Sequence, residues 1–578
     1  MRWRPRSGSR RSSVLNRRSQ PSIALAAALA VTAGLPARAA PTPDDIGARV
    51  DASAAAFMRQ ENIPGLAFAL VDRTHVIKVA QYGRANLETG APVTAATLFG
   101  IGSITKSMTA LALLEAADRG AFDPRAPIAR YVPEFRPQTR WRPITGFDLF
   151  THTSGLPDPT AYGRAQVATA SALSAAYPPG AHWWYSNLGY VVLGTALERI
   201  EHRPWVEIAP QRVFAPLGMS GSEPAYTQAN RSRAATGYDY VFDDRPSPPA
   251  HPVTSVGWIE ADDPDGFVLS TAGDMANYAR FLLGDGTFDG TRVLSPQAFA
   301  LFTHAVVNAG QPGAPGLYAR YGYGLAEATL DGHRVIGHTG GTNQYSACLE
   351  ADVDAGFAAV ALTNHGAMGP RPCAVVEFAL RAARAAHEGQ ALPAPLGPEP
   401  ALPVPNAAQY ARTFRARDGR TLTFVDRGST LVLRDPSGAE FRADARGGDS
   451  FFVDAPRFEL STIDFYRDER GRVDELYYLN DWYRADSYRG PSGDDVPSVL
   501  AALAGHYRVY GDSQNVRIFV RHGQLWLEGA GAMWPAANAA YGVGDRWSPE
   551  RYRFDTFVGG VAQRLLISGI PFIRTFTP

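Results

Sequence analysis

The chain has 578 residues, of which 45% are hydrophobic and 19% charged, and its 56 Lys plus Arg side chains balance 56 Asp plus Glu side chains. This composition is typical of a globular protein, and the length predicts roughly three or four domains. Only two cysteines are present, which excludes a disulfide-rich scaffold and a cysteine-rich zinc site. Cys348 and Cys373 could pair or remain two separate buried thiols.

Residues 1–39 have the pattern of a signal peptide. Several arginines precede an apolar run at residues 23–31, and Ala37-Arg38-Ala39 follows at the spacing of a signal-peptidase site. The run is shorter than the ~20 residues that cross a bilayer, so we expect export to the periplasm or the outside of a bacterial cell. A retained N-terminal anchor is the alternative. The two arginine pairs leave open whether export uses the general or the twin-arginine route.

The charge of the exported chain limits its partners. Removing residues 1–39 takes away eight arginines and no acidic residue, so the mature chain is acidic by eight charges. That sign argues against nucleic acid or an anionic membrane as a partner. No later segment offers 18 uninterrupted apolar residues, so we expect no membrane span in the mature chain.

A first region, residues 43–388, mixes strand and helix patterns. Strands are predicted at residues 64–71 and 76–80, as a hairpin, and at 334–336, 345–350 and 356–362; helices are predicted at 103–117, 189–200 and 373–386. The predicted strands thus lie towards the two ends of this region, and a largely helical segment lies between them. We therefore expect an α+β domain, a sheet with flanking helices and an all-helical layer on one side.

The rest of the chain changes character. Residues 389–405 are rich in proline and predict a stiff linker. Beyond it, short alternating strands are separated by Gly and Asp turns, and the pattern at residues 410–433 is echoed at 503–527. We expect two β-barrels, at 406–492 and 493–578, which could also join copies of the chain. One larger sandwich is the alternative.

Lysine is rare in this chain, because only Lys78 and Lys106 occur among the 56 basic residues. An ammonium can lose its proton when burial lowers its pKa, whereas a guanidinium stays protonated. Helical spacing places Lys106 on the same face as Ser103, where the amine could take the proton of the hydroxyl. The N-terminal end of this helix also favours developing negative charge. Lys78 falls on the second predicted strand and is expected to be solvated.

A second segment, Tyr185-Ser186-Asn187, lies in a tryptophan-rich loop before a predicted helix. Tyr185 could pass a proton to a leaving group, and the Asn187 amide could hydrogen-bond a substrate carbonyl. Taken alone, a tyrosine in such a loop is more often a packed aromatic residue.

A third segment, His338-Thr339-Gly340-Gly341, continues a predicted strand. Its glycines would let a substrate backbone lie against that strand, and the Gly341 N–H could join that of Ser103 in an oxyanion hole. A single histidine here would more often be structural.

In this order, Ser-x-x-Lys, Tyr-x-Asn and His-Thr-Gly resemble the motifs of the serine β-lactamase and penicillin-binding-protein superfamily. The tyrosine is similar to that of the class C β-lactamase-like branch, which includes D-Ala-D-Ala carboxypeptidases, D-aminopeptidases and esterases. Residues 149–156 are also typical of that branch. The resemblance spans residues 64 to about 366, and the paired barrels are similar to the D-aminopeptidase arrangement.

The resemblance implies a role for each matched residue: Ser103 as nucleophile, Lys106 as its base, Tyr185 as general acid and base, His338 in an electrostatic role beside Tyr185, Asn187 and Thr339 in substrate binding, and the amides of Ser103 and Gly341 as the oxyanion hole. His338 stands where β-lactamases usually have lysine, which counts against efficient β-lactam hydrolysis. No cofactor or metal is expected.

We therefore predict a secreted serine hydrolase with an acyl-enzyme on Ser103. Its substrate is expected to be a small molecule or peptide, with an amide or peptide bond favoured, as in a D-aminopeptidase or carboxypeptidase. The alternatives are a carboxylesterase, a weak β-lactamase, or a ligand-binding or sensing protein with a degenerate hydrolase domain. The absence of Gly-x-Ser-x-Gly and of His-Glu-x-x-His disfavours an α/β-hydrolase and a metallohydrolase.

Overall fold

The computed structural model describes residues 42–158, 167–168, 170–242, 245–246, 251–310, 318–397, 403–491, 497–509 and 515–575. The expected signal peptide at residues 1–39 lies outside these ranges, as do residues 398–402 of the expected linker and the expected boundary at 492 and 493. Within the described ranges, no helix combines the length and apolar character needed to cross a membrane.

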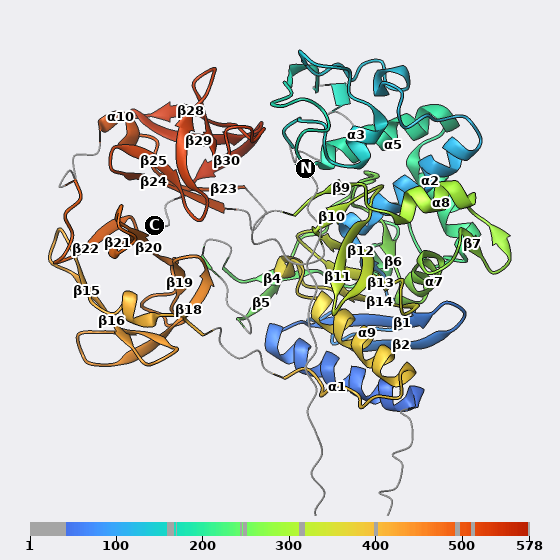
Figure 1. Ribbon diagram of the computed structural model, residues 1–578, viewed down its shortest axis with the longest axis horizontal. Coiled ribbons are helices and arrows are strands. Elements are labelled where there is room, and N and C mark those ends of the chain that lie inside the picture. Colours follow the sequence, from blue (N-terminus) through green and yellow to red (C-terminus); the bar gives the residue numbers. More distant parts are fainter. Residues whose placement is uncertain are drawn as a thin grey trace, which may run out of the picture. The chain divides into compact units, whose positions relative to one another are not determined.

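An antiparallel sheet forms the centre of the N-terminal region (Figure 1). Strands from the start and the end of this region are neighbours in it, because Leu66 pairs with Thr363. In spatial order the strands are β2 (Val76–Gly83), β1 (Gly65–Asp72), β14 (Phe357–Thr363), β13 (Ser346–Asp352), β12 (His333–Gly341), β11 (Ala326–Leu330), β10 (Arg320–Tyr321) and β9 (Val307–Asn308).

Both faces of the sheet are buried, and alternation along β1 shows how. Leu66 and Phe68 belong to one apolar core with α1 and α9, whereas Ala67 and Ala69 belong to a second core with the helices of the middle segment. This confirms the α+β fold. The helices of this region are α1 (Pro43–Glu61), α2 (Thr105–Asp118), α3 (Gly146–Phe150), α5 (Asn187–Glu201), α6 (Trp205–Ala209), α7 (Ala272–Leu282), α8 (Pro296–Thr303) and α9 (Cys373–His387).

Two closed barrels follow, each with its own apolar core, so the alternative of one larger sandwich is wrong. The first contains β15 (Thr413–Ala416), β16 (Thr421–Asp426), β17 (Leu431–Arg434), β18 (Glu440–Gly447), β19 (Ser450–Phe452), β20 (Ile463–Arg467), β21 (Val473–Tyr478) and β22 (Asp481–Ala485). After the short helix α10 (Ser498–Ala501), the second contains β23 (Gly505–Arg508), β24 (Asn515–Arg521), β25 (Gln524–Leu527), β26 (Gly531–Pro535), β27 (Ala540–Val543), β28 (Tyr552–Val558), β29 (Val561–Ile567) and β30 (Ile570–Arg574). First and last strands pair in both, which closes each barrel on itself.

Lys78 is less solvated than expected. Its side chain is only 18% exposed, and its Nζ lies 2.9 Å from the Asp51 Oδ1 of α1. A strand pattern gives the position of this lysine but not the helix that covers it.

Two glycines let strand β12 touch the 3₁₀ turn η1 (Gly102–Ile104), which precedes α2. A Cβ atom at Gly340 would lie 1.9 Å from the carbonyl oxygen of Ile101. A Cβ atom at Gly102, whose φ is +52°, would lie 2.4 Å from the Gly341 nitrogen. This backbone contact places Ser103, in the middle of the turn, beside the end of β12.

Gly340→Ala should therefore destabilise the domain, because the new methyl group collides with a backbone atom that has little freedom to move. We expect a loss of roughly 1–3 kcal/mol in the free energy of unfolding, measured by urea denaturation. Gly341→Ala is the matched control, because a Cβ atom added at Gly341 would have no other group within 4 Å. Equal stability of the two variants would contradict the close contact.

Candidate active site

Ser103 and Lys106 lie together at the start of α2. The Lys106 Nζ is 3.0 Å from the Ser103 Oγ, and the lysine side chain is fully buried. Burial lowers the pKa of Lys106, and the nearby Asp265 and Asp158 carboxylates partly oppose this shift. The amine is thus placed and tuned to accept a proton from the serine hydroxyl.

Three oxygen atoms besides that of Ser103 surround the Lys106 Nζ. Asn187 Oδ1 is 2.7 Å away, the Asp265 carbonyl oxygen 2.8 Å and the Asp265 carboxylate 3.7 Å. Asp158 accepts a hydrogen bond from the Asn187 Nδ2 at 3.0 Å and so fixes which end of the amide meets the lysine. Burial raises the pKa of Asp265, and it raises the pKa of Asp158 to about 6.

Sequence reasoning missed both acids. Asp158 follows the 149–156 segment by two residues, and Asp265 lies in a short acidic run, Asp262-Asp263-Pro264-Asp265. The sequence gives the position of each acid but does not mark either one as buried, because an acidic residue in a loop is usually solvated.

His152, within the 149–156 segment, holds the loop that carries Tyr185. The Ser186 N–H donates to the His152 Nδ1 at 3.0 Å, and the Trp184 N–H donates to the His152 carbonyl at 2.7 Å. The imidazole also packs on the Tyr185 ring, with centroids 4.3 Å apart. The segment therefore belongs to the site as the support of its second motif.

Tyr185 is a neutral phenol in this surrounding. Burial raises the pKa of Tyr185 above its ordinary value, and the hydrogen bond with Ser103 partly opposes this. The Lys106 Nζ lies 5.1 Å from the centroid of its ring. At neutral pH the Tyr185 phenol holds a proton that it can donate near the serine oxygen, whereas burial lowers the pKa of Lys106 and so favours its neutral amine as the proton acceptor.

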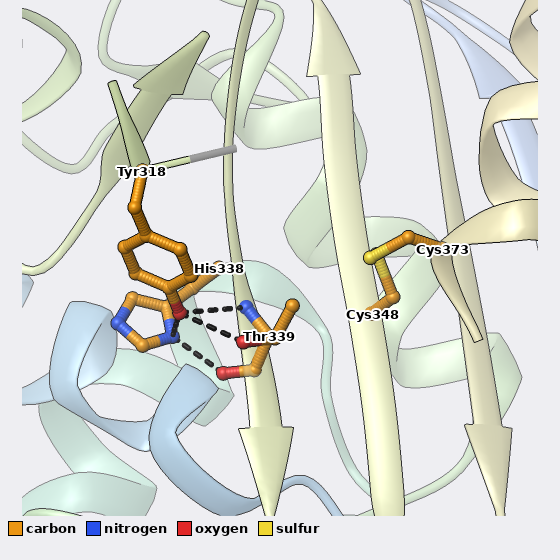
Figure 2. Close-up of a disulfide and its surroundings, with 5 residues drawn as sticks. All are labelled: Tyr318, His338, Thr339, Cys348 and Cys373. Carbon is orange, nitrogen blue, oxygen red and sulfur yellow. Dashed lines mark hydrogen bonds between the residues drawn. A yellow bond between two sulfur atoms is a disulfide. The ribbon is translucent and has the colours of Figure 1, made fainter. Parts of the chain in front are cut away.

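His338 lies beside Tyr185, with their ring centroids 6.2 Å apart. Burial lowers the pKa of His338 to about 3, which favours a neutral imidazole near pH 7. The imidazole also lies between two tyrosines, with its Nε2 2.9 Å from the Tyr321 hydroxyl and its Nδ1 3.3 Å from the Tyr318 hydroxyl. Figure 2 shows that the Tyr318 hydroxyl also faces Thr339, at 2.7 Å from its Oγ1. No sequence motif marks either tyrosine.

A cavity of about 380 Å³ opens at these residues. Its lining contains the nucleophile candidate, the third motif and several aromatic side chains, and none of these side chains is charged. The described lining residues are Ser103, Trp183, Tyr185, Ala309, Tyr318, Thr339 and Gly341. Ser103 and Gly341 thus border one space, as a shared oxyanion hole would require.

Several other proteins are similar to parts of this sequence. An uncharacterised protein of Mycobacterium tuberculosis is 33% identical over 264 residues, which cover 40% of this chain. This chain spans 64% of the length of that protein. Esterase EstB of Burkholderia gladioli is 30% identical over 227 residues, covering 35% of this chain and 56% of the esterase. A D-aminopeptidase of Cereibacter sphaeroides is 26% identical over 394 residues, covering 65% and 71%.

The fold is also that of a solved structure, the octameric penicillin-binding protein homologue from Pyrococcus abyssi. The TM-score is 0.54 at 20% identity, over 76% of this chain and 99% of that protein. The sequence model of the Beta-lactamase family matches residues 50–384, which is more than half of the chain. The expected resemblance is confirmed, and the protein belongs to the Beta-lactamase family, a family of hydrolases with peptidase and esterase members.

Proposed function

We propose that the protein is an exported serine hydrolase that forms an acyl-enzyme on Ser103. The observation that carries this proposal is the fully buried Lys106 amine, 3.0 Å from the Ser103 Oγ, with a pKa lowered by burial. A buried lysine beside a serine at a cavity would serve no structural purpose that a methionine or leucine could not serve at lower cost.

In acylation, Lys106 takes the Ser103 proton while the serine oxygen attacks the substrate carbonyl carbon. The carbonyl oxygen becomes an oxyanion and accepts hydrogen bonds from the N–H groups of Ser103 and Gly341. The bond to the leaving group then breaks, and Tyr185 donates the proton that the leaving group needs. Asn187, held by Asp158, keeps the lysine in place and can also contact the substrate.

In deacylation, a water molecule attacks the ester carbon of the acyl-Ser103. Tyr185, deprotonated in the first step, takes a proton from this water, and the protonated Lys106 returns a proton to the Ser103 oxygen as the acid product leaves. His338 contacts the Tyr321 hydroxyl through its Nε2 and the Tyr318 hydroxyl through its Nδ1, and Tyr318 in turn orients the Thr339 hydroxyl at the cavity.

An amide or peptide substrate, as for a D-aminopeptidase or carboxypeptidase, is the first candidate. The order of the motifs supports it, as does the D-aminopeptidase among the relatives. The neutral His338, in place of the usual lysine, counts against efficient β-lactam hydrolysis. The Ser103–Lys106 contact argues against a sensing protein with a degenerate site.

A carboxylesterase is the second candidate, and the cavity favours it. A free amine or carboxylate on the substrate is usually met by an opposite charge, but the described lining residues offer none. The substrate groups nearest the reacting bond should therefore be uncharged, which suits a neutral ester or a blocked peptide. An esterase is also among the relatives.

Intact-mass measurement after incubation with a fluorophosphonate tests the nucleophile. We expect one covalent adduct on the folded wild type and none on Ser103→Ala, because only the serine oxygen is activated by Lys106. Ser107→Ala, which alters a buried serine one turn along α2, is the matched control and should keep the adduct. A folded wild type that gains no adduct would remove the main support for Ser103 as the nucleophile. A panel of p-nitrophenyl esters, amino-acid anilides and nitrocefin then separates the substrate classes.

Lys106→Arg tests the base. The guanidinium keeps the positive charge but cannot lose its proton, so we expect a folded protein whose kcat/KM falls by about 10²-fold or more. Circular dichroism checks the fold, and Lys78→Arg, at the other lysine, should retain activity. Near wild-type turnover by Lys106→Arg would rule out the base role.

Asp265→Asn tests how the Asp265 carboxylate affects the pKa of Lys106. Activity requires the neutral amine of Lys106. Activity is therefore present at pH values above the pKa of Lys106 and is lost as the pH falls through that value. Because the Asp265 carboxylate raises the pKa of Lys106, its removal should move the acidic limb of the kcat/KM profile to lower pH. The exposed Asp262→Asn is the control and should leave the limb in place. A shift to higher pH would contradict the assignment.

A further inference from the structure

A second cluster of reactive side chains lies one strand away from the third motif. Strand β13 carries Cys348 and Glu350, which are two residues apart and therefore point to the same face of the sheet. Cys348 is bonded as a disulfide to Cys373, the first residue of α9. Figure 2 shows this disulfide beside the strand that carries Thr339, the residue paired with Cys348.

Glu350 is unusual in this position. Its side chain lies in the core between the sheet and α9, and the residue is only 3% exposed. Its Oε2 has no hydrogen-bond partner among the described residues. Burying a carboxyl oxygen without a hydrogen-bond partner destabilises a protein. The proposed hydrolase reaction does not use Glu350, so this cost needs another explanation.

The positions of Glu350 and the two cysteines suggest an explanation for this buried carboxyl. The two cysteine sulfurs and a carboxylate oxygen of Glu350 all lie within 4.8 Å of one another. Two thiolates and a carboxylate are ligands that suit Zn²⁺ and the related thiophilic divalent cations. Cys348, Glu350 and Cys373 come from two rigid elements, a central strand and a helix, which preorganise their positions.

A further carboxylate lies on the same helix, outside this cluster of three. Glu377 lies one turn after Cys373 and hence on the same face of α9. Glu377 is partly exposed and pairs with Arg381 at 3.2 Å, so we do not assign it as a ligand.

We propose that Cys348, Cys373 and Glu350 form a zinc site that opens only when their disulfide is reduced. A phosphine or dithiol reductant supplies two electrons, the S–S bond breaks, and each sulfur takes up a proton. A divalent cation then displaces both thiol protons and the Glu350 proton, giving a complex with two thiolates and one carboxylate. The sulfurs separate to about 3.7 Å, the spacing of two thiolates at 2.3 Å from a tetrahedral Zn²⁺.

Metal titration of the full chain tests the site directly and needs no enzyme activity. Protein reduced with a phosphine, and checked for two free thiols by alkylation and mass measurement, is titrated with Cd²⁺ and Zn²⁺. We expect one Cd²⁺ per reduced chain, with the near-ultraviolet absorption of thiolate-to-cadmium charge transfer, and no such band from the oxidised chain. X-ray absorption of the zinc form should give two sulfur neighbours near 2.3 Å and oxygen neighbours near 2.0–2.2 Å.

Two variants assign the ligands. Glu350→Gln keeps the shape of the side chain and both thiols, and we expect it to weaken Zn²⁺ binding by about tenfold or more. Glu388→Gln, exposed just beyond the end of α9, is the matched control and should bind as the wild type does. Ser103→Ala should also bind normally, which separates this site from the proposed hydrolase function.

Three results would overturn the proposal. They are no binding by the reduced wild type, equal binding by Glu350→Gln, and unfolding on reduction seen by circular dichroism. Should Glu350→Gln fail to fold, the comparison of oxidised and reduced wild type still decides whether the thiols bind metal. The sulfur and oxygen count of the zinc form then decides whether a carboxylate joins them.

Discussion

Lys106 is a cation enclosed by protein, and the rest of the candidate site is arranged around that constraint. Removing an ammonium from water is costly unless oxygen atoms replace its hydration shell. Here four oxygens take that place, from Ser103, Asn187 and both the backbone and the side chain of Asp265. The same burial that makes the charged form expensive is what makes the neutral, basic form accessible.

The lysine surroundings come from segments that are far apart in the chain. The turn before α2 supplies the serine, the first residue of α5, which follows the Tyr185 loop, supplies the amide, and the segment before β6 (Leu269–Ser270) supplies Asp265. The loop is fixed in turn by His152, and the turn is fixed by backbone contact with β12. Each proton-handling group therefore has its position set by a neighbour with another role, which is the usual requirement for catalysis by preorganised groups.

The sequence predicted those parts of the site whose geometry is local. Helical spacing was enough to place Lys106 next to Ser103, apolar runs were enough to predict central strands of the sheet, and short alternating strands were enough to predict the two barrels. It could not predict that Asp158 and Asp265 approach the lysine, because those contacts join residues far apart in the chain. The neutral state of His338 and the ion pair of Lys78 depend on what covers each side chain, which no local pattern contains.

The contact between Gly102 and the Gly340-Gly341 backbone has a consequence for how such an enzyme can evolve. The N–H groups that would meet an oxyanion are positioned by main chain packed on main chain, with no side chain in between. The rim of the cavity is instead formed by side chains such as Trp183 and Ala309, to which we assign no part in the reaction. Mutations at the rim can alter which acyl group enters while the reacting centre keeps its dimensions. The reacting centre is thus built from main chain and the rim from side chains, which gives a structural reason why peptidases and esterases can share one fold and one set of motifs.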